Sequence, residues 1–239
     1  MRQTLSAAAL TALVPLMAAA GSLTLFASGE DLATEGFAEP RLTKDGWALE
    51  FTRILATFDS ITAFQTDPPF MADGPDITGT PVAFAGPVTV DLVDADARDL
   101  VELGSVAAPE GRFNALAWAL VPAAEGAAAG YSLIFEGTAR RNGQEVAFTL
   151  TTADSVMHAC GEYLGDDRKG FVTATAGAEL EITLHLDHLF GRADRQADDP
   201  MNIEAIGFEP FAAGGRHGIS LGGLHLGHVG EGHCHVTPL

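Results

Sequence analysis

The stretch Tyr131-Ser-Leu-Ile-Phe-Glu-Gly-Thr-Ala-Arg-Arg-Asn-Gly-Gln-Glu-Val-Ala-Phe-Thr-Leu150 gives the clearest indication of the fold. Apolar side chains alternate with polar or small ones on both sides of Asn142-Gly143, which is the period of a half-buried strand. Asparagine and glycine both tolerate the positive φ angles that a type I′ turn requires. The stretch therefore predicts a β-hairpin whose tip lies at residues 142–143.

The segment after Trp47 carries another strand pattern. Apolar residues alternate with polar or small ones from Trp47 to Phe51, and the alternation resumes one residue out of phase at Ile54. A shift of this kind predicts a β-bulge near Thr52-Arg53, inside one continuous strand.

Short strands separated by turns recur along the chain. Residues 113–121 are apolar on both faces, which predicts a central strand, with an alanine-rich helix as the competing interpretation. Residues 171–175 and 180–186 predict a second hairpin that turns at Ala176-Gly177. The other expected elements are strands within 82–93 on either side of Gly86-Pro87, a loop over 65–80 and one short helix within 200–211. The pattern predicts one all-β domain over residues 29–239, an antiparallel β-sandwich with a His/Gly-rich C-terminal extension.

The stretch Thr43-Lys-Asp-Gly-Trp-Ala-Leu-Glu-Phe-Thr-Arg-Ile54 resembles the opening of uncharacterised bacterial secreted or lipoprotein β-sandwich families. The resemblance implies an exported bacterial protein and carries over no functional residue. The chain lacks the lipobox cysteine of such lipoproteins, and this departure argues against attachment to lipid.

The N-terminus has the pattern of an export signal. Arg2 supplies a positive charge, residues 5–20 are apolar, and Ala18-Ala19-Ala20 offers a small-residue cleavage site. We therefore expect a signal peptide over residues 1–20 and a periplasmic or secreted protein that does not insert into the membrane after cleavage. Because the apolar character continues to Ala27, a signal that reaches about residue 28 and an uncleaved anchor are the alternatives.

The chain has two cysteines, Cys160 and Cys234. An even pair in an oxidising compartment usually forms a disulfide. We expect this bridge to tie the C-terminal segment to the middle of the domain.

The formal net charge of the chain is −19. Such a protein repels nucleic-acid phosphates and anionic lipid head groups, so both are excluded as partners. It attracts cations, which agrees with metal handling, although an acidic surface also keeps exported proteins soluble.

Seven of the 8 histidines follow residue 180. Imidazole is the commonest protein ligand for transition metals, because its neutral nitrogen donates a lone pair at neutral pH. Their spacings repeat in pairs two or three residues apart. The predicted metal ligands are His185, His188, His225, His228, His233 and His235. The seventh is His217.

The local geometry of two pairs can be predicted. In an extended chain, His233 and His235 project to one side and Cys234 to the other, where it is free to form the disulfide. If residues 180–186 form a strand, His185 and Asp187 are neighbours on its outer face.

Histidine together with carboxylate favours zinc, with copper as the alternative. The 5 methionines do not cluster near the histidines along the sequence, so the pattern does not indicate a thioether Cu(I) site. The sequence therefore predicts an exported zinc or copper carrier or buffer whose partners are the metal ion and a membrane metal transporter or receptor.

Two other functions are compatible with the sequence. The chain could be a secreted structural or protein-interaction module without a specific metal, or a zinc-dependent hydrolase in which Glu231 acts as the general base. No nucleophile elbow, phosphate-binding glycine loop or zinc-protease helix motif occurs in the sequence. We therefore expect a binding protein rather than an enzyme.

Overall fold

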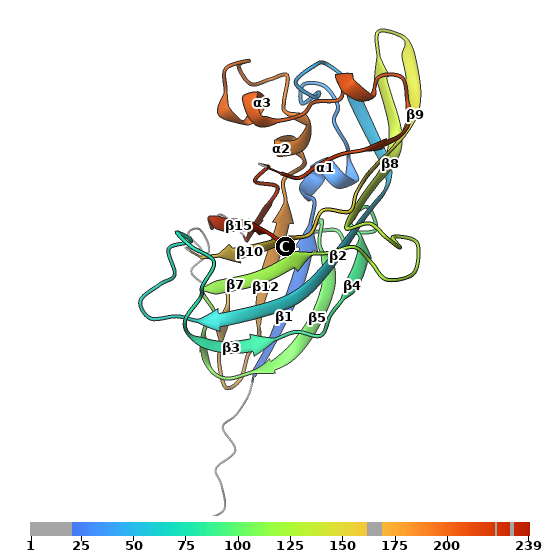
Figure 1. The fold of residues 1–239 in the computed structure, drawn as a ribbon. Helices are drawn as coiled ribbons and strands as arrows, with labels where there is room; N and C mark the ends of the chain where they lie inside the picture. The colour runs from blue at the N-terminus through green and yellow to red at the C-terminus, as the bar shows by residue number, and fades with distance from the viewer. Residues whose placement is uncertain (1–20, 162–168, 223, 230–231) are drawn as a thin grey trace, which may run out of the picture.

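The computed structural model describes residues 21–161, 169–222, 224–229 and 232–239, and within these ranges the fold is all-β (Figure 1). A small sheet has four strands in the order β14 (Gly227–Val229), β12 (Ala178–Leu184), β1 (Gly21–Ser28) and β5 (Val101–Ala108). The main path of a larger sheet runs β13 (Gly215–Gly218), β9 (Gln144–Thr152), β8 (Leu133–Arg141), β2 (Ala48–Gln65), β7 (Ala115–Leu120), β10 (Val156–Cys160) and β15 (Cys234–Pro238).

Three further pairings complete the strand arrangement of the described residues. Strands β3 (Thr80–Ala83) and β4 (Val88–Asp91) both pair with β2, and β6 (Gly111–Arg112) pairs with β11 (Phe171–Val172). The predicted all-β class is confirmed, but the sheets are mixed rather than purely antiparallel. Strand β1 runs parallel to β12, and β13 runs parallel to β9. Both parallel pairs join segments far apart in sequence, and such pairs need long crossovers that strand patterns do not reveal.

The hairpin predicted around Asn142-Gly143 is strands β8 and β9. Both turn residues have positive φ, 51° at Asn142 and 82° at Gly143, as a type I′ turn requires. The pairing of β2 with β8 changes register between Phe51 and Arg53, which confirms the predicted bulge. The bulge lets β2 keep its apolar face toward the core while the strand continues to Gln65.

Strand β7 lies between β2 and β10, so the prediction of a central strand is confirmed and the helical interpretation is wrong. The expected hairpin around Ala176-Gly177 is also wrong. Strand β11 pairs with β6, whereas β12 pairs with β1 and β14. The alternation identified the strand segments, but the partners were set by long-range packing.

The helices are short: α1 (Glu30–Thr34), α2 (Leu186–Phe190), α3 (Pro200–Glu204) and the 3-10 turn η1 (Glu209–Phe211). The region expected to hold one helix thus contains two pieces, because Ala205 is extended, with ψ 143°. Figure 1 shows α1, α2 and α3 together at one end of the molecule, beyond the ends of β1 and β12.

One hydrophobic core joins the two larger sheets. It contains fully buried aromatic rings from the large sheet, such as Phe58 and Trp118, and aliphatic side chains from the small sheet, such as Leu25 and Ile182. The helices extend this core, since Leu186, Leu189 and Phe190 of α2 are completely buried. The elements around the helices are therefore held in fixed positions relative to both sheets.

The N-terminal predictions concern two segments, and only the second lies within the described residues. Residues 1–20, the expected signal peptide, lie outside the described residues. Residues 21–28 form strand β1, which lies between β12 and β5. Within the described ranges, no helix has the length and apolar character needed to cross a membrane.

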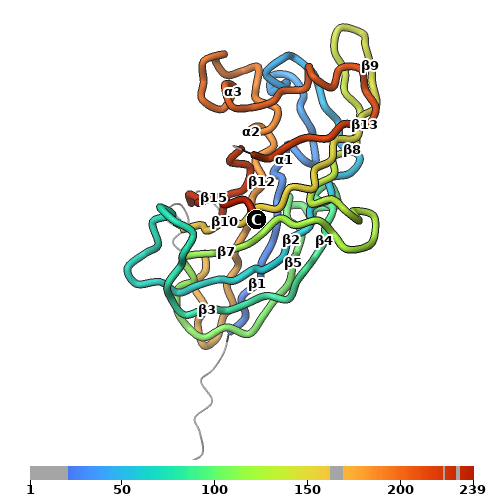
Figure 2. Tube along the Cα trace, in the orientation of Figure 1, coloured from blue at the N-terminus to red at the C-terminus, as the bar shows by residue number. Residues whose placement is uncertain are grey.

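The C-terminal segment contributes strands to both sheets: β14 to the small one, β13 and β15 to the large one. Figure 2 shows this segment running from β13, beside β9, to β15, beside β10. The predicted disulfide between Cys160 and Cys234 is present and joins β10 to β15 at a directly paired position. It links positions 74 residues apart, so it fixes the histidine-rich segment to the middle of the chain.

Candidate metal centre

The first two histidines of the site lie at the junction between β12 and α2. The strand ends at Leu184, and His185 is the N-cap residue of α2. The expectation that His185 and Asp187 would be neighbours on a strand face is therefore wrong. The buried residues Leu186, Leu189 and Phe190 follow helical spacing, and burying all three requires a helical turn. This turn brings the rings of His185 and His188 together, with centroids 5.3 Å apart.

His228 joins them from strand β14. This strand pairs with β12, and Thr183 lies opposite His228. The His228 ring centroid is 4.7 Å from that of His185 and 5.5 Å from that of His188. Three imidazoles from segments more than 30 residues apart in sequence thus form one cluster, which we call the histidine triad.

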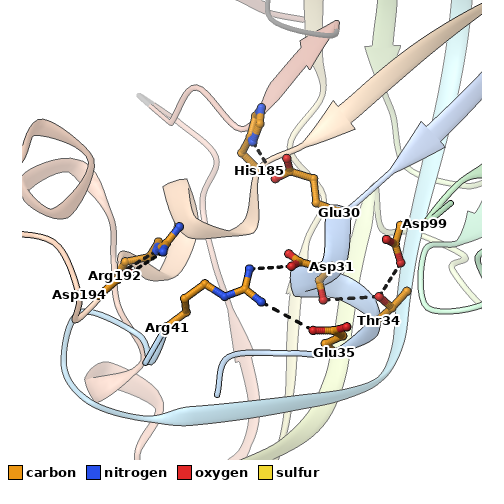
Figure 3. A network of polar contacts seen from close by, with 9 residues as sticks. All are labelled: Glu30, Asp31, Thr34, Glu35, Arg41, Asp99, His185, Arg192 and Asp194. Atoms are coloured by element: carbon orange, nitrogen blue, oxygen red, sulfur yellow. Dashed lines mark hydrogen bonds and ion pairs between the residues drawn. The ribbon is translucent and has the colours of Figure 1, made fainter. Parts of the chain in front are cut away.

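Each ring of the triad has one nitrogen in a hydrogen bond. His185 Nδ1 lies 3.0 Å from Glu30 Oε2, and Figure 3 shows the two side chains directed at each other. His188 Nδ1 donates to the backbone carbonyl of His225 at 2.8 Å, and His228 Nε2 donates to the same carbonyl at 3.2 Å. Because a carbonyl oxygen only accepts, the neutral forms of these two rings carry their lone pairs on the opposite nitrogens.

Bonds of this type are the usual support of metal-ligating histidines. Such a histidine donates its second ring N–H to a carboxylate or a backbone carbonyl, which fixes the tautomer and the ring orientation. In the triad, the carboxylate is that of Glu30 and the carbonyl is that of His225. The nitrogens left for a ligand are Nε2 of His185, Nε2 of His188 and Nδ1 of His228.

Glu30 is held in place by the contacts of helix α1. Its backbone N–H donates to Ser28 Oγ at 2.9 Å, and its φ angle is 55°, which a non-glycine residue rarely adopts. Figure 3 shows Arg41 against the same helix, with its guanidinium 2.7 Å from Asp31 Oδ2 and 3.7 Å from Glu35 Oε2. A backbone conformation of this kind persists only where the surrounding contacts hold it, so Glu30 has a fixed place beside His185.

The environments of His185 and His228 shift their pKa values in opposite directions. Burial by itself lowers the pKa of His185, but the hydrogen bond and charge of Glu30, with help from Asp187, raise it above the usual value. Burial, together with the neighbouring imidazoles His185 and His188, lowers the pKa of His228 to about 4. At neutral pH His228 is therefore uncharged and has a lone pair to donate.

A pocket of about 330 Å³ opens beside the triad. His188 and His228 belong to both the triad and the pocket wall, and His225 and His233 line the pocket as well. The wall also includes Met201 and Glu204 of α3, and Cys234 of β15. Four of the six predicted ligands therefore surround one cavity, and His185 is in ring contact with two of these four.

The remaining histidines lie elsewhere. His235, the sixth predicted ligand, is half-buried opposite Ala159 in β15, outside both the triad and the described pocket wall. His217 packs on the ring of Phe211, and its Nε2 bonds to the carbonyl of Gly214. Glu231, the general base of the hydrolase alternative, lies outside the described residues.

Several residues beside the triad and its pocket could not be identified from the sequence. Glu30 is 155 residues from its partner His185, and no motif connects them. Met201 and Glu204 lie in a short helix whose position depends on packing against α2. The sequence shows that Glu204 is acidic and that Met201 carries a soft sulfur. Nothing in the sequence indicates that either residue lies near the histidines.

The triad is not a preformed metal cage. Among the described residues, no group of three or more His, Cys, Asp or Glu side chains is arranged so that it could hold a metal ion. The free nitrogens of the triad thus have to turn toward a common point before they can share an ion. The ring torsions of histidine are broad, so such a rotation needs no change of backbone.

The comparisons with known proteins add no assignment. No protein-family model, no curated protein and no solved structure matches this chain.

Proposed function

We propose that this chain is an exported transition-metal-binding protein, a carrier or buffer for zinc or copper, and that its ligands come from the histidine triad. The observation that carries the proposal is the spacing of the three rings. With metal–nitrogen bonds of about 2.1 Å and tetrahedral angles, coordinated imidazoles have ring centroids about 5 Å apart. The centroids of His185, His188 and His228 lie 4.7–5.5 Å apart.

The hydrogen bonds of the triad support the same proposal. Each of these bonds occupies one ring nitrogen and leaves the other without a hydrogen-bond partner among the described residues, as in a supported metal ligand. All three triad rings have this arrangement, and two of them line an open pocket. These hydrogen bonds set which nitrogen of each ring carries the lone pair, and loading requires the rings to turn toward a common point.

An open pocket suits exchange of the ion more than permanent storage. His225 and His233 on the pocket wall offer further nitrogens to an incoming or leaving ion, and the net charge of −19 attracts cations. A membrane metal transporter or receptor is the partner we propose for delivery. The disulfide between Cys160 and Cys234 suits an oxidising compartment such as the periplasm.

The proposal is tested by equilibrium dialysis against zinc and copper, followed by elemental analysis of the mature protein. We expect one ion per chain at neutral pH in the unmodified protein, and loss of that ion in the double variant His188→Ala/His228→Ala. The matched control is His217→Ala, because His217 is a half-buried histidine outside the pocket.

Two outcomes would contradict the proposal. One is an unmodified protein that takes up no stoichiometric ion. The other is equal uptake by the unmodified protein and the double variant, which would mean that the ions bind adventitiously at other histidines. A secreted interaction module with incidental histidines would then be the better interpretation.

A further inference from the structure

Met201 belongs to the wall of the pocket in the candidate metal centre. It lines the same cavity as His188 and His228, although the sequence separates it from both. The sequence pattern placed no methionine near the histidines and so gave no indication of a thioether ligand. The fold corrects that expectation for one of the 5 methionines.

The backbone of Met201 is held firmly. Its N–H donates to Asp199 Oδ1 at 3.0 Å, and its carbonyl accepts from the N–H of Ala205 at 2.9 Å. The next residue, Asn202, is buried and bonds to both the N–H and the carbonyl of Arg192, just beyond α2. Helix α3 is thereby fixed beside α2, which keeps Met201 on the pocket wall that it shares with His188.

The side chain of Met201 is not needed to close the core. It is half-exposed on the pocket wall, and the neighbouring Ile203 is 67% exposed. A flexible, unbranched thioether at such a position can adapt its sulfur to a ligand with little cost in packing. The other sulfur on the described wall, that of Cys234, is in the disulfide and cannot act as a thiolate.

Sulfur and imidazole together distinguish between the two metals. Thioethers are soft ligands that select Cu(I), whereas zinc prefers imidazole, thiolate and carboxylate. We infer that the ion carried by this protein is copper, and that Met201 ligates Cu(I) beside His188 and His228. This inference rests on the proposed function, and it names the metal that the same site takes.

The test compares Met201→Leu with the unmodified protein. Leucine has nearly the volume of methionine and lacks the sulfur, so thermal unfolding without metal should stay unchanged. Cu(I) affinity is measured anaerobically by competition with a chromophoric Cu(I) chelator, and zinc affinity by competition with a zinc indicator. We expect Cu(I) binding to weaken by about tenfold or more, equivalent to about 1.4 kcal/mol, while zinc affinity is unchanged.

A spectroscopic measurement separates ligation from packing. With selenomethionine in place of methionine, X-ray absorption at the selenium edge of the Cu(I)-loaded protein should show a copper neighbour, and Met201→Leu should remove it. Unchanged Cu(I) affinity in Met201→Leu, an equal loss of zinc affinity, or a selenium edge without copper would overturn the inference.

Failure of this inference and failure of the proposed function give different results. If His188→Ala/His228→Ala loses its ion while Met201→Leu binds Cu(I) normally, the metal site stands and the assignment of copper through Met201 fails. If the double variant keeps its ion, the proposed function fails as well.

Discussion

Two regions of this protein use histidine in opposite ways. In the core, His158 lies flat on Trp118, with ring centroids 3.7 Å apart and an angle of 3° between the planes. It is 2% exposed, and its Nδ1 has no hydrogen-bond partner among the described residues. In the triad, each ring is partly exposed and supported by a carboxylate or carbonyl.

The pKa values divide the two regions only in part. Burial, with the nearby imidazoles His228 and His225, lowers the pKa of His158 to about 3, so this ring stays neutral and serves as an aromatic core side chain. The triad has both a raised pKa, at His185, and a lowered one, at His228. The comparison shows that a candidate ligand needs a supported nitrogen, an open one and neighbouring imidazoles, because His217 also bonds to a carbonyl but lies outside the triad.

Gly227 separates the two regions. A Cβ atom at this position would lie 2.3 Å from Cη2 of Trp118 and 2.9 Å from Nε2 of His158, so the core stack fills all the space on that side. The next residue, His228, turns to the triad. One short strand thus closes the core with a glycine and supplies the site with an imidazole.

The largest expected effect is on the free energy of unfolding, through the packing of the core. Trp118→Ala should lower the free energy of unfolding by about 3–5 kcal/mol, because it removes a fully buried ring that packs on His158, Phe58 and Gly227. Urea denaturation checks this value. A loss below about 1 kcal/mol would mean that the stack does not hold the sheets together.

The disulfide connects the two regions and should have the next largest effect. Cys160→Ala/Cys234→Ala should cost about 2–4 kcal/mol of stability, since the bridge closes a long loop in the unfolded chain. Urea midpoints of the variant and the unmodified protein give the difference. Metal uptake at saturating ion should persist, and its loss would show that the bridge also shapes the triad.

Acidification should affect the core imidazole strongly. The folded-state pKa of His158 lies near 3, below its usual value, so protonation of this ring favours the unfolded chain. The contribution of the neutral His158 ring to stability is therefore fully present above pH 6.5 and is lost as the pH falls toward 3. Between pH 7 and 5, this group should remove about 2 kcal/mol of stability. His185, whose pKa is raised, acts in the opposite sense: its contribution is full at low pH and is lost as the pH rises through the folded pKa.

The variant His158→Phe tests this prediction, because phenylalanine keeps the stacking and cannot be protonated. Stability measured by urea denaturation from pH 7 to 5 should fall less steeply in the variant than in the unmodified protein. Equal slopes would contradict the assignment of the pH dependence to the core ring.

The smallest predicted effect concerns the support of His185. Glu30→Gln removes the carboxylate charge beside His185, and it should weaken metal binding by about tenfold, at the low end for changes to a group that hydrogen-bonds to a metal ligand. Glu35→Gln is the matched control, since Glu35 ends the same helix and lies near Arg41 instead of the triad. Competition titrations with a metal indicator measure both, and equal affinities for the two variants would remove Glu30 from the site.

Much of the local structure was predictable from the sequence. Alternation located β2, β7, β8 and β9, and the Asn142-Gly143 turn and the bulge before Ile54 followed from backbone preferences. The parallel pairing of β1 with β12 was not predictable, because no local pattern records which distant strand fills a sheet edge. The turn at His185 was also missed, since Ile182, Leu184 and Leu186 continue a strand alternation into the first residue of a helix.

The candidate site was predictable in its residue type but only partly in its membership. Histidine spacing identified His185, His188 and His228, which the fold brings into contact. The same spacing included His235, which the strand pairing of β15 places elsewhere. Glu30 and Met201 reach the site only through tertiary packing, so no sequence spacing could have selected them.

The most direct test of the central claim is a crystal of the metal-loaded protein with anomalous scattering recorded at the copper and zinc edges. We expect one dominant peak per chain, about 2.1 Å from the open nitrogens of His188 and His228, with the His185 ring turned toward it. A loaded crystal whose anomalous peaks lie only at other histidines, such as His217 or His235, would contradict it.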